Sequence, residues 1–292
     1  MEFYEKGAHP ISNDWWMKKI SSKGFYHSRS NFGQTPAYFA EKYYGKTIHW
    51  FPSDHIERYQ EHLSDAKTYK LLEQNGWIDK KINYHINKQG FRHDGTQPDI
   101  TSEKGGVIWL GDSNTFGTGI EIERTWPWIC HHSNDLLKDL RYINFGCPGY
   151  GIDTYYRLLK YYIDDIKPDY VIMTTPWITT RAETYGRYGH WEVVTPHEEG
   201  INKHGDRWGN YIFSDHSAMI RWLKNLDAIK WLCHQHNTTF FCPEDCDSPI
   251  VNKFSHHSIK HDYARDLIHP GYENNKYNAD IMNRVINDVF KT

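Results

Sequence analysis

The feature that most constrains the fold of this chain is an alternation of short apolar runs with helix-like segments, which begins near Gly105. Four runs are apolar or β-branched and are bounded by turn residues, which is typical of strands: residues 107–110, 142–145, 169–174 and 238–242. Strands that alternate with helices favour a parallel sheet covered by helices on both faces. We therefore predict an α/β domain over residues 101–292.

Two helices are expected within this alternation, together with one segment that interrupts it. Apolar side chains recur at three- and four-residue steps before the fourth strand and predict one buried helix face, made of Met219, Trp222, Leu223, Leu226, Ile229 and Leu232. Residues 274–290 are predicted to form the closing helix. Residues 181–216 are rich in glycine, with β-like pieces at 191–195 and 211–213. We interpret this segment as an inserted hairpin or lid, because structureless loops of that length are uncommon in compact domains.

The first hundred residues are interpreted as an accessory region that packs on the α/β domain. Residues 54–75 predict a helix, with Ser53 as its N-cap. Residues 82–92 predict a strand. The predicted organisation is therefore an accessory region at residues 1–100, followed by the α/β domain with its insert.

Composition excludes several classes of protein. Aromatic residues make up 16% of the chain, which a disordered protein would not carry. The mean hydropathy is −0.79, and no apolar run approaches the roughly 18 residues that a membrane-spanning helix needs. We therefore expect no membrane insertion. The net charge is −3 and no basic block is present, so we also expect no nucleic-acid partner. The N-terminus lacks the pattern of a secretory signal, which predicts a cytoplasmic location unless export follows another route.

A serine follows the first predicted strand, in the sequence Gly111-Asp112-Ser113. A serine at a strand-to-helix turn lies at the carboxyl edge of the sheet, where open α/β folds bind their ligands. Its hydroxyl needs a base, and Asp266 and His269 supply a candidate pair just before the closing helix. We predict Ser113, His269 and Asp266 as the catalytic residues, with Asp266 fixing the tautomer and orientation of the imidazole. Asp112 is predicted to be a structural, helix-capping carboxylate.

A glycine-containing turn follows the second predicted strand, in the sequence NFGCPG from Asn144 to Gly149. Acyl transfer develops negative charge on a carbonyl oxygen, which backbone N–H groups can stabilise. Glycine allows the backbone to approach closely. We therefore predict an oxyanion hole formed by the backbone amides of Ser113 and Gly149.

These blocks resemble the SGNH (GDSL-type) hydrolase family, through Gly-Asp-Ser after the first strand, Asn-x-Gly-x-x-Gly after the second and Asp-x-x-His-Pro before the last helix. The resemblance covers about residues 105–292, and the sequence INKQGFR at 86–92 resembles a lead-in of many bacterial members. It implies a flavodoxin-like three-layer αβα sandwich with a parallel sheet. It also implies Ser113 as nucleophile, His269 as base and Asp266 as its partner. Family members cleave or transfer acyl groups on lipids, sugars, polysaccharides and thioesters.

One block departs from the family pattern. Members usually carry Gly-x-Asn-Asp after the third strand, and the asparagine side chain donates a hydrogen bond to the oxyanion. Residues 174–180 read TTPWITT here and contain no asparagine. Loss of one such donor costs roughly 10² to 10³ in rate in other hydrolases. Thr179 or Thr180 could replace this donor through its hydroxyl, or Arg181 could replace it. The preferred prediction is an oxyanion hole of two backbone amides with a partial contribution from Thr179.

Tryptophans near the predicted catalytic edge suggest a substrate platform, because flat apolar faces suit sugar rings and acyl chains. The candidates come from segments expected to border that edge: Trp126, Trp128, Trp177, Trp191 and Trp208. The predicted substrate-binding residues are Trp177, Arg181, Trp191 and Trp208. Six further tryptophans are expected to be packing residues: Trp15, Trp16, Trp50, Trp77, Trp222 and Trp231.

No metal or other cofactor is predicted. His257 and His261 have a spacing that suits one helix face, but no third and fourth ligand accompanies them. Cys242 and Cys246 likewise lack the four ligands of a structural zinc site and the closer spacing of a redox pair.

Two functions remain open from the sequence. The first is a serine esterase that cleaves a small or carbohydrate-borne acyl ester through an acyl-enzyme, or an O-acyltransferase that uses the same triad. The second is a non-catalytic binding or structural protein with a degenerate site, which the missing asparagine motivates. The expected partner is an ester substrate, either a small molecule or a saccharide, and the oligomeric state is not predicted.

Overall fold

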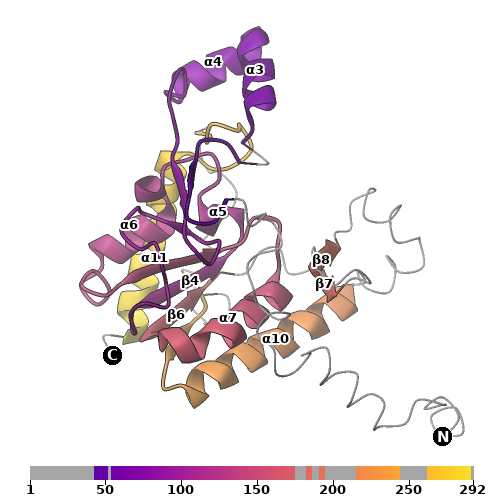
Figure 1. The fold of residues 1–292 in the computed structure, drawn as a ribbon. Helices are drawn as coiled ribbons and strands as arrows, with labels where there is room; N and C mark the ends of the chain where they lie inside the picture. The colour runs from indigo at the N-terminus through magenta and orange to yellow at the C-terminus, as the bar shows by residue number, and fades with distance from the viewer. Residues whose placement is uncertain are drawn as a thin grey trace, which may run out of the picture.

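The centre of the molecule is a four-stranded parallel sheet, seen in a computed structural model that describes residues 43–51, 54–174, 182–185, 191–194, 215–243 and 262–290 (Figure 1). The strands lie in the order β5-β4-β6-β9. Their bounds are Val107–Gly111 (β4), Tyr142–Gly146 (β5), Tyr170–Met173 (β6) and Thr239–Phe241 (β9). Each strand boundary lies within about one residue of the predicted run, so the α/β prediction is confirmed.

Helices cover both faces of this sheet. Helices α7 (Ile152–Ile166) and α10 (Asp215–Gln235) lie on one face, and α6 (Trp126–Ser133) and α11 (Tyr272–Phe290) lie on the other (Figure 1). Successive side chains of a strand point to opposite faces. Ile108 and Leu110 accordingly belong to the α7/α10 core, whereas Val107 and Trp109 belong to the α6/α11 core. The result is the expected three-layer arrangement.

The strand order reverses at β4, because the chain passes from β4 to β5 on one side and then to β6 on the other side. Open α/β sheets bind ligands outside the carboxyl ends of the strands at such a reversal. The short helix α5 (Ser113–Phe116) begins at this point, directly after β4, and the 3₁₀ turn η3 (Ile122–Arg124) follows it.

Helix α10 corrects part of the predicted buried face. Its buried side chains include Trp222, Leu226, Ile229 and Leu232, as expected. Met219 and Leu223 are 43% and 46% exposed, however, because the stripe that packs against α7 is narrower than the apolar pattern. Trp231, expected to be a packing residue, is 61% exposed on the same helix.

The helix predicted at residues 54–75 is two helices, α3 (Ile56–Ser64) and α4 (Ala66–Gln74). Asp65 has extended backbone angles, and its carboxylate accepts hydrogen bonds from the N–H groups of Lys67 and Thr68. It therefore ends α3 and caps α4. The N-cap of α3 is His55, and Ser53 lies outside the described residues.

The strand predicted at residues 82–92 is a hairpin within a small antiparallel sheet, β1 (Thr47–Ile48), β2 (Tyr84–Ile86) and β3 (Arg92–His93). Asn87 makes the turn, because its Oδ1 accepts hydrogen bonds from the N–H groups of Gln89 and Phe91. An asparagine that bonds its own backbone two residues on is a known turn former.

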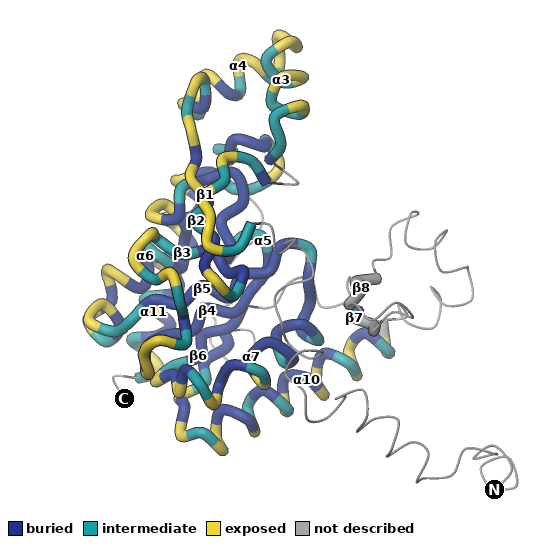
Figure 2. The backbone as a smooth tube through the Cα atoms, in the orientation of Figure 1, coloured by how far each residue is buried: buried dark blue, intermediate teal, exposed yellow. Residues whose placement is uncertain are grey.

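A third core joins the accessory region to the α/β part. Phe116, Ile120 and Ala264 pack in one cluster with accessory side chains, namely Phe51, Leu72, Trp77, Ile82, Tyr84 and Ile86. Helices α3 and α4 themselves extend away from the sheet and are largely exposed or half-buried, in contrast to the dark strands of the centre (Figure 2). The accessory region thus contacts α5 and the loop before α11.

Strands β7 (Ala182–Tyr185) and β8 (Trp191–Val194) form an antiparallel hairpin within the predicted insert. The β-like piece expected at residues 211–213 lies outside the described residues. Glu183 anchors the hairpin to α7, because Arg157 donates to its carboxylate through Nε at 2.8 Å and through Nη2 at 2.6 Å. Across the described ranges, no helix combines the length and apolarity needed to cross a membrane.

Candidate active site

Ser113 is the first residue of α5 and lies at the carboxyl end of β4. Asp112 caps the helix, because its Oδ1 accepts a hydrogen bond of 2.9 Å from the N–H of Asn114. The predicted structural role of Asp112 is therefore confirmed. Ser113 is half-buried, so its side chain lies at the edge of the protein surface rather than within the core.

The turn after β5 holds α5 in place. Asn144, which is 3% exposed, donates from Nδ2 to the carbonyl of Thr115 at 3.0 Å and accepts from the N–H of Gly146 at 2.7 Å. A Cβ atom at Gly146 would lie 2.6 Å from Phe116 Cα, so only glycine allows the two backbones to approach. Asn144 and Gly146 therefore position α5 against the sheet.

The two amides predicted for the oxyanion hole are both available. Gly149 has φ of +84°, and a Cβ atom there would meet nothing within 4 Å, so open space adjoins its backbone. Among the described residues, neither the N–H of Ser113 nor that of Gly149 has an acceptor. Unpaired donors at the carboxyl edge of a sheet suit the binding of a developing oxyanion.

Asp266 and His269 form the expected pair in the loop that precedes α11. The two side chains are joined by a hydrogen bond of 2.5 Å between His269 Nδ1 and Asp266 Oδ2. Asp266 Oδ1 accepts from the N–H groups of Ile268 and His269. Leu267, between them, has φ of +55°, an uncommon conformation for a residue other than glycine. Strained backbone of this kind is concentrated at functional sites.

The pKa of His269 is raised above its ordinary value, although burial alone would lower it. The hydrogen bond that His269 donates to Asp266 and the charge of Asp266 outweigh the effect of burial, and the charges of Asp112 and Asp54 add to the rise. An imidazole held through Nδ1 presents Nε2 to a substrate or a nucleophile. The Asp266–His269 pair thus has the hydrogen bond through Nδ1 that fixes the tautomer of an imidazole.

The loop of Asp266 and His269 packs on the segment that follows Ser113. The N–H of Arg265 donates to the carbonyl of Gly119 at 2.8 Å, and a Cβ atom at Gly119 would lie 3.2 Å from Asp266 Oδ1. The described part of the chain shows no direct hydrogen bond between Ser113 and His269. Catalytic hydrogen bonds in ligand-free enzymes are often long and tighten only with substrate.

Two of the predicted platform tryptophans are core residues instead. Trp126 is 1% exposed and packs edge-to-face on Trp109, with ring centroids 5.4 Å apart. Trp128 is half-buried against the same core and stacks on His132 at 3.7 Å. Both lie on α6, which packs against α11.

Several predicted residues fall outside the described part of the chain: Thr179, Thr180, Trp177, Arg181, Trp208, His257, His261 and Cys246. The backbone of Trp191 pairs with Tyr185 in the β7–β8 hairpin. Within the described ranges, no three histidine, cysteine or acidic side chains are grouped to hold a metal ion.

The sequence did not reveal the buried arginines that support the site. Arg92, 1% exposed, donates to the carbonyls of Phe116, Gly117 and Ile120 at the end of α5. Arg265, also 1% exposed, precedes Asp266 and pairs with Asp54. The available signal was an arginine inside each recognised block, at the end of INKQGFR and directly before Asp-x-x-His.

No family model matches the chain, and no curated protein matches it. Solved structures that match part of it include a carbohydrate acetylesterase from Sinorhizobium meliloti, which is 16% identical in sequence and has a TM-score of 0.30. The match covers 64% of this chain and 100% of that chain. A lipase/acylhydrolase from Enterococcus faecalis has 16% identity, 64% and 96% coverage and a TM-score of 0.30. These similarities are distant, and the α/β architecture of the chain stands on the strand order and layers described above.

Proposed function

We propose that the protein is a serine hydrolase that cleaves a small or carbohydrate-borne acyl ester through an acyl-enzyme. The observation that carries the proposal is the hydrogen-bonded Asp266–His269 pair, whose loop packs on the segment that follows Ser113. The N–H groups of Ser113 and Gly149 are unpaired among the described residues. The blocks that resemble the SGNH family contribute all four of these residues.

In the proposed reaction, Ser113 Oγ attacks the acyl carbon of the ester while His269 Nε2 takes the hydroxyl proton. The negative charge that forms on the carbonyl oxygen is stabilised by the N–H groups of Ser113 and Gly149. The tetrahedral intermediate then expels the alcohol, which takes the proton from His269. Water attacks the acyl-enzyme with His269 again acting as base, and the carboxylic acid leaves as Ser113 is regenerated.

The test compares wild type with Ser113→Ala on p-nitrophenyl acetate. We expect turnover by the wild type and loss of nearly all of it in the variant. Labelling by a fluorophosphonate probe provides a second measurement that needs no knowledge of the natural ester. Equal hydrolysis by the two proteins, with no labelled Ser113 in the wild type, would end the catalytic proposal. Transfer of the acyl group to a sugar hydroxyl in place of water would identify an acyltransferase.

A non-catalytic binding protein is the second candidate, favoured by the sequence TTPWITT where the family carries its oxyanion asparagine. Such a protein would keep the fold but would not react with the probe. A wild type that binds acetylated oligosaccharides without cleaving them and resists labelling would support this candidate over the hydrolase.

A further inference from the structure

Arg265 is a buried cation that the proposed chemistry does not use. Its Nε donates to Asp54 Oδ1 at 2.9 Å and its Nη2 donates to Asp54 Oδ2 at 2.6 Å. Each side chain of the pair is 1% exposed. The two residues lie 211 positions apart, so the contact joins the accessory region to the loop of Asp266 and His269.

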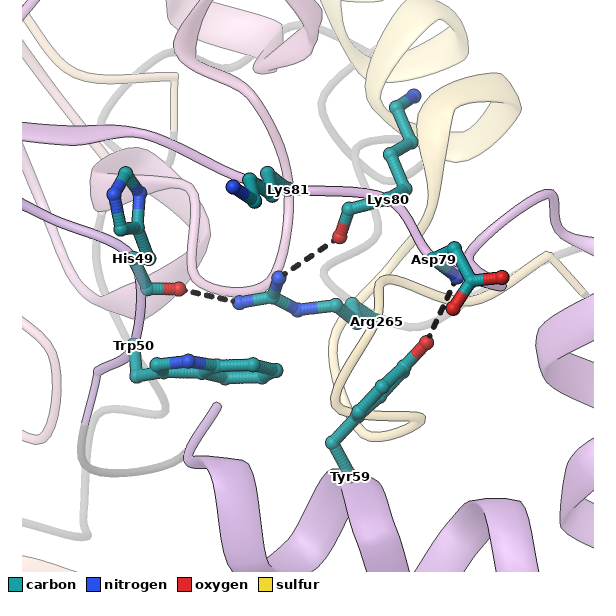
Figure 3. A pocket seen from close by; sticks show the side chains of 7 residues that line it. All are labelled: His49, Trp50, Tyr59, Asp79, Lys80, Lys81 and Arg265. Atoms are coloured by element: carbon teal, nitrogen blue, oxygen red, sulfur yellow. Dashed lines mark hydrogen bonds between the residues drawn. The ribbon is translucent and has the colours of Figure 1, made fainter.

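The remaining donors of Arg265 bind backbone carbonyls of the accessory region. Nη1 donates to Lys80 at 3.1 Å and Nη2 donates to His49 at 2.7 Å (Figure 3). The guanidinium carbon lies 3.9 Å from the ring centre of Trp50, which lies flat beneath it (Figure 3). These contacts fix the guanidinium in both position and plane.

The same network reaches the segment that follows the nucleophile helix. Tyr84 donates from its hydroxyl to Asp54 at 2.6 Å and accepts from the N–H of Gly119 at 2.9 Å. Gly119 in turn accepts, at its carbonyl, the N–H of Arg265 at 2.8 Å. A Cβ atom at Gly119 would lie 3.2 Å from Asp266 Oδ1, so this segment packs directly on the catalytic carboxylate.

A buried ion pair of this kind contributes little net stability, because removing two charges from water offsets most of their attraction. Its documented advantage in some proteins is a unique arrangement of the groups around it. Here the arrangement includes the nucleophile helix through Gly119 and the His269 loop through Arg265. An apolar pair in place of Arg265 and Asp54 would lack the hydrogen bonds that hold the nucleophile helix and the His269 loop at the same time.

We propose that Arg265, paired with Asp54, is a positioning residue that holds Asp266 and His269 in register with Ser113. The inference rests on the proposed hydrolase function. It makes the accessory region part of the active-site framework, since Asp54, Tyr84 and the two bound carbonyls all belong to that region.

The first experiment reads the Asp266–His269 hydrogen bond in the resting protein and needs no activity. A short Nδ1–H···Oδ2 bond gives a strongly downfield proton resonance, which His269→Gln assigns. Arg265→Met, similar in length but unable to bind Asp54, is expected to lose this resonance or move it upfield. Arg141→Met is the matched control, because Arg141 also binds two carbonyls, those of Ile100 and Gly105, but at the amino end of the sheet. It should keep the resonance.

The second experiment measures the pH profile of the same variant. Asp266 raises the pKa of His269 through its hydrogen bond and its charge, which outweigh the lowering by burial. Loss of the Asp266 contact would lower that pKa, so positioning predicts that the acid limb of kcat/KM moves to lower pH. The value of kcat should fall roughly 10²-fold, as for a misplaced catalytic group, with KM changed less than about twofold.

Asp54→Asn keeps the shape of Asp54 and replaces Arg265→Met in both experiments if that variant does not fold. We expect the same changes in the resonance and in the pH profile, but smaller ones. A folded variant that retains the resonance, or an acid limb that moves to higher pH, would overturn the positioning role. If the wild type shows no turnover that depends on Ser113, the proposed function fails, while the resonance still decides whether Arg265 holds the pair.

Discussion

Trp77 donates a 2.7 Å hydrogen bond from its indole Nε1 to the backbone carbonyl of Tyr263, 186 residues further along the chain. Asn75 completes the link, because its Oδ1 accepts the N–H of Tyr263 at 2.9 Å. Two residues that follow α4 therefore bind the backbone N–H and C=O of Tyr263, which lies two positions before Arg265. Together with the Asp54–Arg265 pair, this gives the loop two independent attachments to the accessory region.

Trp77→Phe should lower the free energy of unfolding by about 2 kcal/mol, because it removes the hydrogen bond and part of a side chain that is 2% exposed. Trp231→Phe is the matched control, since Trp231 is 61% exposed and should change stability by less than about 0.5 kcal/mol. Urea unfolding measures both. Equal losses in the two variants would contradict the role given to Trp77.

Gly146→Ala should prevent α5 from packing on β5, because the new methyl group would meet the backbone of Phe116 rather than a movable side chain. We expect a loss of several kcal/mol in stability and no fluorophosphonate labelling of Ser113. The measurements are thermal unfolding and labelling. A variant that unfolds and labels like wild type would show that the close approach is not required.

Gly149→Ala tests the oxyanion role of an amide whose surroundings are open. The left-handed φ of +84° predicts a strain of about 1 kcal/mol on substitution, without a clash. Gly45→Ala is the control, since Gly45 has φ of +68° and equally open surroundings but lies far from the site in sequence. Both variants should lose similar stability, and only Gly149→Ala should lose ester turnover. Loss of turnover in both would mean that strain alone explains it.

The sheet, the Asp112 cap and the Asp266–His269 pair could be predicted from the sequence because their signals are local. A buried parallel strand is apolar along its whole length, and the residues Asp112 and Asp266 act on atoms two or three positions away. The contact between the accessory region and the loop of Asp266 and His269 gives no such signal. Asp54 and Arg265 find each other only in the folded chain, so no pattern in the sequence predicts the pair.

Each incorrect prediction has a physical cause that the pattern of apolar residues does not report. The apolar pattern of α10 includes Met219 and Leu223, but the width of the contact with α7 decides which side chains are buried. The helix expected over 54–75 breaks because the side chain of Asp65 accepts hydrogen bonds from the backbone of the next turn. The spacing of apolar residues does not report such side-chain-to-backbone hydrogen bonds. Trp126 and Trp128 follow Ser113 in sequence, but α6 packs them into the core that it shares with the sheet and α11.

Ester hydrolysis should have its acid limb above pH 6.5, because His269 acts as base only when neutral and its pKa is raised. Asp266→Asn removes the group that outweighs burial, so the pKa of His269 and the acid limb should move to lower pH. The value of kcat should fall by roughly 10⁴, as when the tautomer is no longer fixed in a serine protease triad. The pH profile of kcat/KM measures both. An unchanged limb in Asp266→Asn would show that Asp266 does not control the imidazole.

The last prediction concerns His131, a fully buried side chain on α6 whose Nε2 lies 2.9 Å from the carbonyl of Leu140. Burial lowers the pKa of His131 to about 4. Its Nδ1 has no partner among the described residues, so a second proton there would have no acceptor. The ring therefore stays neutral in the folded protein at pH values where the unfolded chain binds a proton.

Because the unfolded state binds more protons between pH 6.5 and about 4, stability must fall as the pH drops through this interval. The loss attributable to His131 is on the order of 3 kcal/mol. His131→Gln, which can still donate to Leu140, should unfold with a shallower pH dependence in urea titrations from pH 7 to 4. His234→Gln, an exposed change on α10, should retain the steeper dependence of wild type. Parallel curves for wild type and His131→Gln would show that another group controls the acid instability.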